Sequence, residues 1–291
     1  MLLFLASFFV SALAAPTISP YAYSDAFARN KILTMCSASV NIQPLKCLKV
    51  HFEQPELKRR YDVACSKYDV DRCVAYTAMD HVDQAILIGF RATSDSFQFD
   101  LEAEETAFGN RTYWVGGGRV SEYFANGFMA IWNGGMKNDF ITLRNLYPTY
   151  QVWIAGHSLG GAMASLCASY IATLNLADAT KMRLVTFGQP RTGDQDFATA
   201  HDKALPYSYR IIHEKDEIAH LPMQYYEHYH HHKAEVWYNN NMTTSDTENY
   251  RICYKEDSLL CSDSQKGLNR ADHTYYFNTD VYGWGSKGCP S

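Results

Sequence analysis

Residues 152–163 read VWIAGHSLGGAM, and the rest of the fold can be worked out from this stretch. An apolar run ends in one serine, Ser158, inside the pattern G-x-S-x-G, and small apolar residues follow it. The run predicts a buried strand, and the stretch after it, without Asp, Glu, Lys or Arg up to position 177, predicts a buried helix. A serine on the sharp turn between such a strand and helix is a nucleophile elbow.

The elbow has chemical consequences for the residues around the serine. A Cβ at Gly156 or Gly160 would collide with the tight turn or the neighbouring strand. The helix that begins after Ser158 points its first backbone N–H groups, and its positive dipole end, at the hydroxyl. We therefore expect the N–H of Leu159 to be one donor of an oxyanion hole.

Alternating strands and helices are predicted along the chain. Apolar runs bounded by turn residues predict strands at 73–79, 85–91, 151–156, 183–188, 208–213 and 235–238. Helical periodicity is present at 120–131, 136–146 and 159–176. The alternation indicates the α/β class, with a central mixed, mostly parallel sheet flanked by helices. No repeat or linker-like stretch divides residues 15–291, so we expect a single domain there.

Charge and the N-terminal segment indicate the compartment. The formal net charge of −5 gives no electrostatic support for binding nucleic acid. Residues 1–14 are apolar, too short to span a bilayer, and end in the small-x-small tripeptide ALA at 12–14, so we expect a cleaved signal peptide. Glycosylation sequons at Asn110 and Asn241 also fit a secreted protein.

The eight cysteines fit an oxidising compartment, but they allow 105 pairings. The candidates for disulfide bonds are Cys47, Cys65, Cys73, Cys253, Cys261 and Cys289. Short spacing favours pairing Cys65 with Cys73 and Cys253 with Cys261. Cys167, in the apolar helix, is expected to be a free buried thiol.

A serine nucleophile needs a base, and the base needs a carboxylate that orients it. In elbow enzymes these residues follow the serine in the order acid, then histidine. Asp216 follows the predicted strand 208–213, and His273 stands in a late loop before a cluster of aromatic residues. His213 and His220 are alternative bases, and Asp194 is an alternative acid, although its setting in GQPRTGD is more typical of a turn.

Six blocks stand in a fixed order along the chain: ILIGFRATS (86–94), GHSLGGA (156–162), VTFGQPRTGD (185–194), YRIIHEKDEIAHLP (209–222), EVWYNN (235–240) and DHTYYF (272–277). Together they resemble the class 3 lipase family, which includes filamentous-fungal triacylglycerol lipases and feruloyl esterases. The tracts GQPRTGDQDFA and HHKAEVWYNNNM are similar to the nematode branch in particular. The resemblance implies an α/β-hydrolase fold with Ser158 as nucleophile, Asp216 as its carboxylate and His273 as general base.

The resemblance also implies a second oxyanion donor and a lid. The family has F-R-G-[S/T] where this chain has FRAT at 90–93, so Thr93 becomes the second donor and an alanine replaces the glycine. Residues 94–108 match the family's lid, with Phe97 and Leu101 on one helical face. A loop with a Cys pair just before the histidine, as in the family, matches Cys253 and Cys261.

The expected activity is that of a serine ester hydrolase that needs no cofactor. The resemblance favours an acylglycerol substrate, met at a transient lipid–water interface by a monomer. A phospholipase, an esterase of soluble aromatic or sugar esters, and a non-catalytic lipid-binding relative are the alternatives. The run EHYHHH at 227–232 contains metal-ligand residue types, but it lacks the i, i+4 helical spacing and a partner Cys or Asp pattern, so we expect no metal.

Overall fold

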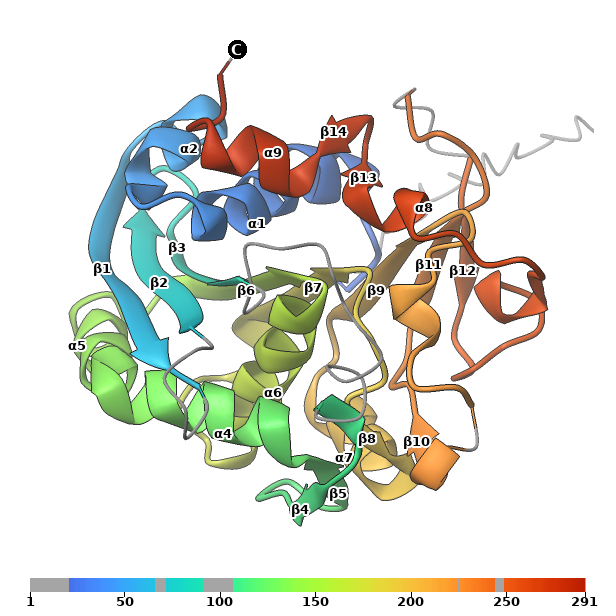
Figure 1. Cartoon of the computed structure of the whole chain (residues 1–291). Helices are drawn as coiled ribbons and strands as arrows, with labels where there is room; N and C mark the ends of the chain where they lie inside the picture. Colours follow the sequence, from blue (N-terminus) through green and yellow to red (C-terminus); the bar gives the residue numbers. More distant parts are fainter. Residues whose placement is uncertain (1–20, 66–71, 92–106, 225, 244–248, 291) are drawn as a thin grey trace, which may run out of the picture.

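An eight-stranded sheet runs through the middle of the molecule (Figure 1). The structure is a computed structural model, and it describes residues 21–65, 72–91, 107–224, 226–243 and 249–290. The strands, in their order across the sheet, are β1 (Pro55–Ala64), β2 (Arg72–Asp80), β3 (Ala85–Arg91), β6 (Gln151–His157), β7 (Met182–Phe187), β9 (Ser208–His213), β11 (Glu235–Tyr238) and β12 (Arg251–Cys253). Neighbouring strands from β3 to β11 pair in parallel, and β1, β2 and β12 pair antiparallel.

The sheet confirms the predicted class and all six predicted strands. Strands β3, β9 and β11 have the predicted bounds, β2 and β6 are slightly longer, and β7 begins and ends one residue earlier. The middle of each parallel strand is buried, because helices cover both faces of a parallel sheet. A continuous apolar run was therefore a reliable signal for these strands.

Helices form a layer on each face of the sheet, as Figure 1 shows. One layer holds η1 (Phe27–Ile32), α1 (Leu33–Val40), α2 (Pro44–His51) and α9 (Val281–Ser286). The other holds α4 (Glu122–Ile131), η2 (Trp132–Met136), α5 (Lys137–Leu146), α6 (Leu159–Thr173) and α7 (Gln195–Ala204). None of the helices in the described ranges combines the length and the apolar character that a bilayer crossing requires.

Two small sheets and several single turns complete the described chain. The second sheet has the order β10 (Tyr229–His230), β8 (Gly193–Asp194), β5 (Arg119–Ser121) and β4 (Arg111–Tyr113). The third pairs β13 (Tyr275–Tyr276) with β14 (Thr279–Asp280). The short helical turns are η3 (Ala179–Lys181), η4 (Ile218–His220), η5 (Tyr226–His228), η6 (Ser262–Ser264) and α8 (Ala271–Thr274).

The predicted helix 159–176 was too long, because the chain leaves the helix through a left-handed residue. Helix α6 ends at Thr173, Asn175 has a φ of 51°, and the N–H of Leu176 donates to Ile171 O at 2.9 Å. This closing bond satisfies a carbonyl that the helix end would otherwise leave without a partner.

The predicted helix 120–131 began too early. Val120 and Ser121 belong to β5, and the Ser121 hydroxyl caps α4 by accepting from the N–H of Phe124 at 3.2 Å. Helix α5 likewise starts one residue after the predicted position, following η2.

Strand β1 was missed because its sequence, PELKRRYDVA, is highly charged. Among the described strands it pairs with β2 alone, and most of its residues are partly or fully exposed. Charged side chains on an edge strand discourage pairing with other chains, so an edge strand need not carry an apolar run.

Candidate active site

Ser158 occupies the turn between β6 and α6 with a backbone φ of 59° and ψ of −133°. A non-glycine residue with positive φ is strained, and the turn is held by a hydrogen bond from Ser158 N–H to Phe187 O at 2.9 Å. A Cβ at Gly160 would stand 2.4 Å from Phe90 O, so only glycine lets the first turn of α6 approach the end of β3. The local geometry is that of the predicted elbow.

Leu159 is the first residue of α6 and is buried. The first N–H groups of a helix have no partner within the helix, so they can serve an anion at the elbow. The predicted second donor, Thr93, and the predicted lid residues Phe97 and Leu101 lie outside the described residues.

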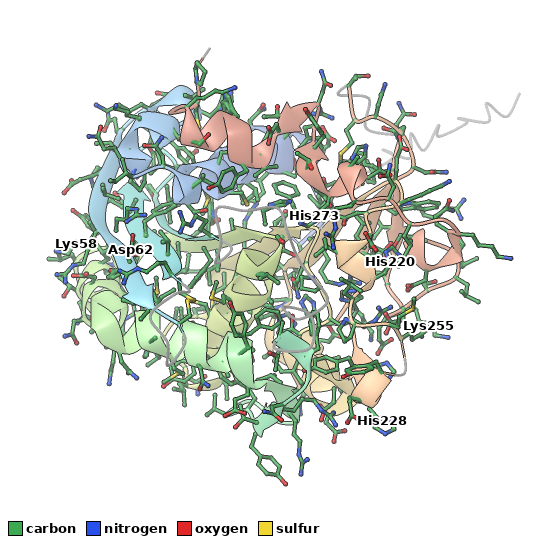
Figure 2. All side chains as sticks on the ribbon, viewed as in Figure 1. Lys58, Asp62, His220, His228, Lys255 and His273 are labelled. Carbon is green, nitrogen blue, oxygen red and sulfur yellow. A yellow bond between two sulfur atoms is a disulfide. The ribbon has the colours of Figure 1, made fainter. Side chains whose placement is uncertain are left out.

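His273 faces Asp216 (His273 is labelled in Figure 2). Its Nδ1 lies 2.9 Å from each oxygen of the fully buried Asp216 carboxylate. The carboxylate also accepts the Tyr276 hydroxyl at 2.5 Å and the N–H of Ile218 at 2.9 Å. Burial by itself raises the pKa of Asp216, but the charge of His273 and the hydrogen bonds from His273 and Tyr276 lower that pKa to about 2. The carboxylate therefore stays ionised and orients the imidazole.

The alternative bases do not reach this carboxylate. The Nδ1 atom of His220 contacts the backbone O of Asp216 at 2.7 Å, and that of His213 contacts Asp272 O at 3.0 Å. The alternative acid, Asp194, caps α7 by accepting from the N–H of Phe197 at 3.0 Å. The structure thus brings His273, and neither alternative histidine, against Asp216.

The comparisons with known proteins identify the family of this chain. The family model described as lipase (class 3) matches residues 87–226. Lipase ZK262.3 of Caenorhabditis elegans is 31% identical over 300 residues, which cover 92% of this chain and 83% of that protein. The chain belongs to the class 3 lipase family. It is therefore an ester hydrolase with the α/β-hydrolase fold.

Fungal proteins also match this chain, at lower identity. The secreted mono- and diacylglycerol lipase 1 of Fusarium solani is 26% identical over 211 residues, covering 70% of this chain and 60% of that protein. Among solved structures, the Rhizomucor miehei lipase–propeptide complex matches with a TM-score of 0.74 and 24% identity, over 90% of this chain and 83% of that one. The structural match supports the fold.

His157, the residue before Ser158, packs against His273. The two rings are stacked, with centroids 4.5 Å apart, and Nε2 of His157 lies 2.8 Å from His273 O. Because a carbonyl only accepts, His157 carries the proton on Nε2. Burial and the nearby charge of His273 lower the pKa of His157 to about 3, so the ring that touches His273 is neutral.

Tyr276 is the functional candidate that sequence reasoning missed. It lies on β13, three residues after His273, and its side chain is fully buried. Its hydroxyl is one of the groups that keep Asp216 ionised. The only signal in the sequence was its place in the aromatic run DHTYYF, and that run does not distinguish Tyr276 from Tyr275.

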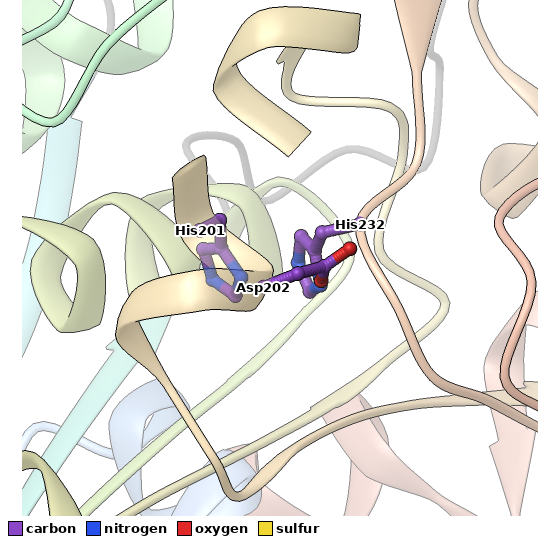
Figure 3. A group of neighbouring side chains, drawn as sticks. All are labelled: His201, Asp202 and His232. Carbon is purple, nitrogen blue, oxygen red and sulfur yellow. The ribbon is translucent and has the colours of Figure 1, made fainter. Parts of the chain in front are cut away.

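In the part of the chain that the structure describes, one group of side chains has the spacing of metal ligands: His201, Asp202 and His232, with ligand atoms within 4.8 Å of one another (Figure 3). His232 uses both ring nitrogens, since Nδ1 contacts Lys233 O at 2.8 Å and Nε2 contacts the Gln189 amide at 3.0 Å. The imidazole rings of His201 and His232 are stacked, with centroids 3.8 Å apart and planes 20° from parallel.

Imidazole binds a metal in the plane of its ring, so stacked rings do not direct their lone pairs at a common point. Burial is the main cause that lowers the pKa of His201 and His232, and the positive charge of Arg210 lowers both further. The same positive charge opposes a cation at this place. These contacts favour a packed network of two neutral histidines over a metal centre.

Three disulfides join the predicted cysteines: Cys47–Cys289, Cys65–Cys73 and Cys253–Cys261. Cys36 and Cys167 are free and buried, and burial raises the pKa of both thiols. The sequon residues Asn110 and Asn241 are both exposed.

Proposed function

We propose that this protein is a secreted triacylglycerol lipase that works through an acyl-enzyme. The Oγ atom of Ser158 attacks the ester carbonyl while His273 takes the hydroxyl proton. His273 then gives that proton to the leaving alcohol, and Asp216 holds the imidazole in the required tautomer. Water attacks the acyl-enzyme by the same sequence, releases the fatty acid and restores Ser158.

The observation that carries this proposal is the contact of His273 Nδ1 with both oxygens of Asp216 at 2.9 Å. That contact leaves Nε2 of His273 as the base toward a serine. His157, the residue next to Ser158, stacks on the same imidazole and so links the elbow to the base. The backbone N–H groups of Leu159 and Thr93 would stabilise the oxyanion, each by about 3 kcal/mol.

Export of the enzyme is supported by several features. Residues 1–14 have the pattern of a signal peptide, which would leave residues 15–291 as one catalytic domain. The three disulfides fit an oxidising compartment, and the exposed sequons at Asn110 and Asn241 can carry glycans there. The relative from Fusarium solani is itself described as secreted. We expect a monomer that acts at a lipid–water interface and binds no nucleic acid.

The substrate class is tested by a hydrolysis panel of p-nitrophenyl esters of rising chain length, triolein, a phospholipid and methyl ferulate. A triacylglycerol lipase hydrolyses triolein and prefers the longer esters. Cleavage of the phospholipid or of methyl ferulate without cleavage of triolein would instead support the phospholipase or soluble-ester alternative. The relatives described as mono- and diacylglycerol lipases favour the acylglycerol class.

The lid is tested with a short-chain triglyceride. If residues 94–108 cover the serine, hydrolysis rises more steeply once the substrate exceeds its solubility. Replacing Phe97 and Leu101 with serine reduces that rise. A rate that runs smoothly through the solubility limit would show that this segment is not a gate.

A further inference from the structure

The disulfide loop Cys253–Cys261 presents two leucines to solvent. Leu259 is 73% exposed and Leu260 is 69% exposed, although both are large aliphatic residues in a cross-linked loop, directly before its second cysteine. Met223, on the neighbouring loop, is 70% exposed. Scattered apolar residues on a surface need no explanation, but adjacent ones on a rigid loop indicate a surface that is covered in use.

The loop is rigid as well as exposed. Ser258, a buried residue, accepts the N–H of Leu260 with its hydroxyl at 3.3 Å and the N–H of Cys261 with its carbonyl at 2.9 Å. Asp257 has a φ of 46°, a strained value for a residue other than glycine, and its carboxylate accepts two hydrogen bonds from Arg191. The turn that presents the leucines is therefore fixed before anything binds, which lowers the entropic cost of binding.

Arg191 connects this loop to the segment that follows Asp216. Its side chain is 1% exposed and contacts Asp257 and Asp263 at 2.8 and 3.1 Å. Its Nη1 also donates to His220 O at 2.6 Å and to Pro222 O at 2.9 Å, next to Met223. The exposed apolar residues of the two loops are thus fixed to one buried guanidinium, close in the chain to the triad acid.

The charge around the leucines differs from that of the whole chain. The chain carries a net −5, but between positions 249 and 268 the fully exposed charged residues are basic: Arg251, Lys255 and Lys266 (Lys255 is labelled in Figure 2). The one further acid in the disulfide loop, Glu256, is only partly exposed and accepts a hydrogen bond from Gln195 at 3.2 Å. Arg251 Nη1 donates to Leu260 O at 2.8 Å, which places a guanidinium beside the apolar pair. The acidic residues Asp257 and Asp263 are largely buried with Arg191 and add little negative charge to the surface.

We propose that Leu259, Leu260 and Met223, with Arg251, Lys255 and Lys266, form a docking surface for an anionic lipid surface. Aliphatic side chains beside basic ones are the combination that holds a protein at a charged lipid–water boundary. Ester hydrolysis itself leaves fatty-acid carboxylates at such a boundary, so the surface would hold the enzyme where its product gathers. This inference deepens the proposed function, on which it rests for the identity of the lipid.

The test is binding of vesicles by the full chain in a Ser158→Ala background, which prevents lipid hydrolysis during the measurement. Leu259→Ser with Leu260→Ser is compared with a matched control, Ile42→Ser with Leu146→Ser. The control residues are 78% and 64% exposed and lie elsewhere. Phosphatidylcholine vesicles are used with and without phosphatidylglycerol, and thermal unfolding checks that each variant is folded.

The Leu259/Leu260 variant should bind anionic vesicles about tenfold or more weakly, while the control binds as the parent does. Replacing Lys255 and Lys266 with glutamine should reduce the preference for anionic over neutral vesicles by about tenfold. Equal loss in both leucine and control variants, or loss in neither, overturns the docking surface. Equal binding of the parent to neutral and anionic vesicles overturns the assignment of an anionic partner.

A second copy of the chain is the competing occupant, and light scattering tests it. A dimer that the Leu259/Leu260 variant converts to a monomer would overturn the lipid assignment. The binding assay does not depend on turnover, so it also separates the two proposals. A wild-type protein that hydrolyses no ester in the panel would refute the proposed function, whereas active enzyme with unchanged vesicle binding in the leucine variant refutes only this inference.

Discussion

Two buried groups in this lipase each place a histidine close to an aspartate, and they are built differently. At the elbow, His273 turns its Nδ1 edge toward the Asp216 carboxylate. On the last turn of α7, His201 instead lies face to face with His232, and among the described residues neither of its ring nitrogens has a hydrogen-bond partner. The first histidine is aimed at its acid, and the second is only packed.

The carboxylates differ in the same way. Asp216 accepts hydrogen bonds from His273, Tyr276 and the N–H of Ile218, and its pKa falls to about 2 although it is fully buried. Asp202 accepts one from the N–H of Lys233, and burial raises its pKa to about 6. Donors that converge on a buried carboxylate keep it ionised even in acid, as at Asp216, whereas a carboxylate with a single donor, as at Asp202, takes up its proton at a much higher pH.

The largest expected effect comes from removing the proposed nucleophile, Ser158. Ser158→Ala should lower kcat by about a million-fold, because the acyl-transfer step loses its attacking atom. Thermal unfolding should remain close to that of the wild type. A variant that keeps a tenth of the activity would break the assignment of the elbow as the reacting centre.

Matched substitutions of the two acids compare the groups directly. Asp216→Asn should lower kcat by about 10⁴-fold, since the neutral amide no longer selects the tautomer or balances the imidazolium. Asp202→Asn should leave kcat unchanged. Steady-state kinetics on a soluble p-nitrophenyl ester decides between them, and similar losses in both variants would show that the two groups are not functionally distinct.

The Tyr276 hydroxyl can be removed while its neighbour serves as control. Tyr276→Phe should lower kcat roughly tenfold with little change in KM, because a charged acceptor loses one hydrogen bond. The pKa of Asp216 should rise, because its ionised form loses a donor. Tyr275→Phe, at a half-exposed position, should change neither quantity. A loss of thermal stability without any change in kcat would assign Tyr276 a structural role only.

The smallest expected effect is a pH dependence of stability from the second group. Burial, followed by the charge of Arg210, lowers the pKa of His201 to about 3, whereas an unfolded histidine titrates near 6.5. Between these values the unfolded chain binds more protons, so the free energy of unfolding falls as the pH drops.

His201→Phe keeps the packing and removes this titration. Between pH 6.5 and 5, the wild type should lose about 2 kcal/mol more than the variant, as measured by urea unfolding. The same pH slope in both proteins would mean that His201 binds protons in the folded protein as it does in the unfolded chain. Activity at neutral pH should be equal in both.

The parts of the fold that sequence reasoning predicted well are those with a local cause. Strands β3, β6, β7 and β9 are covered on both faces, so each is an apolar run that can be seen in the sequence. Strand β1 stands at the end of the strand order and is partly or fully exposed along most of its length. Its charged sequence therefore contains no apolar run that would predict a strand. Helices α1 and α2 were missed as well. Helix α1 is buried almost all round, so its sequence shows no apolar stripe on one face.

The sequence by itself determined the elbow at Ser158, the order of the acid and histidine candidates, and the family. These follow from residues adjacent in the chain, where glycine, strand and helix patterns act over a few positions. Only the tertiary structure decided that Tyr276 donates to Asp216, that His157 stacks on His273, and that Arg191 holds two distant loops. Tyr276 and Asp216 lie 60 positions apart, and His157 and His273 lie 116 apart. The partners of Arg191 lie between 29 and 72 positions from it. Packing of the whole chain, rather than any local pattern, therefore sets these distances and directions.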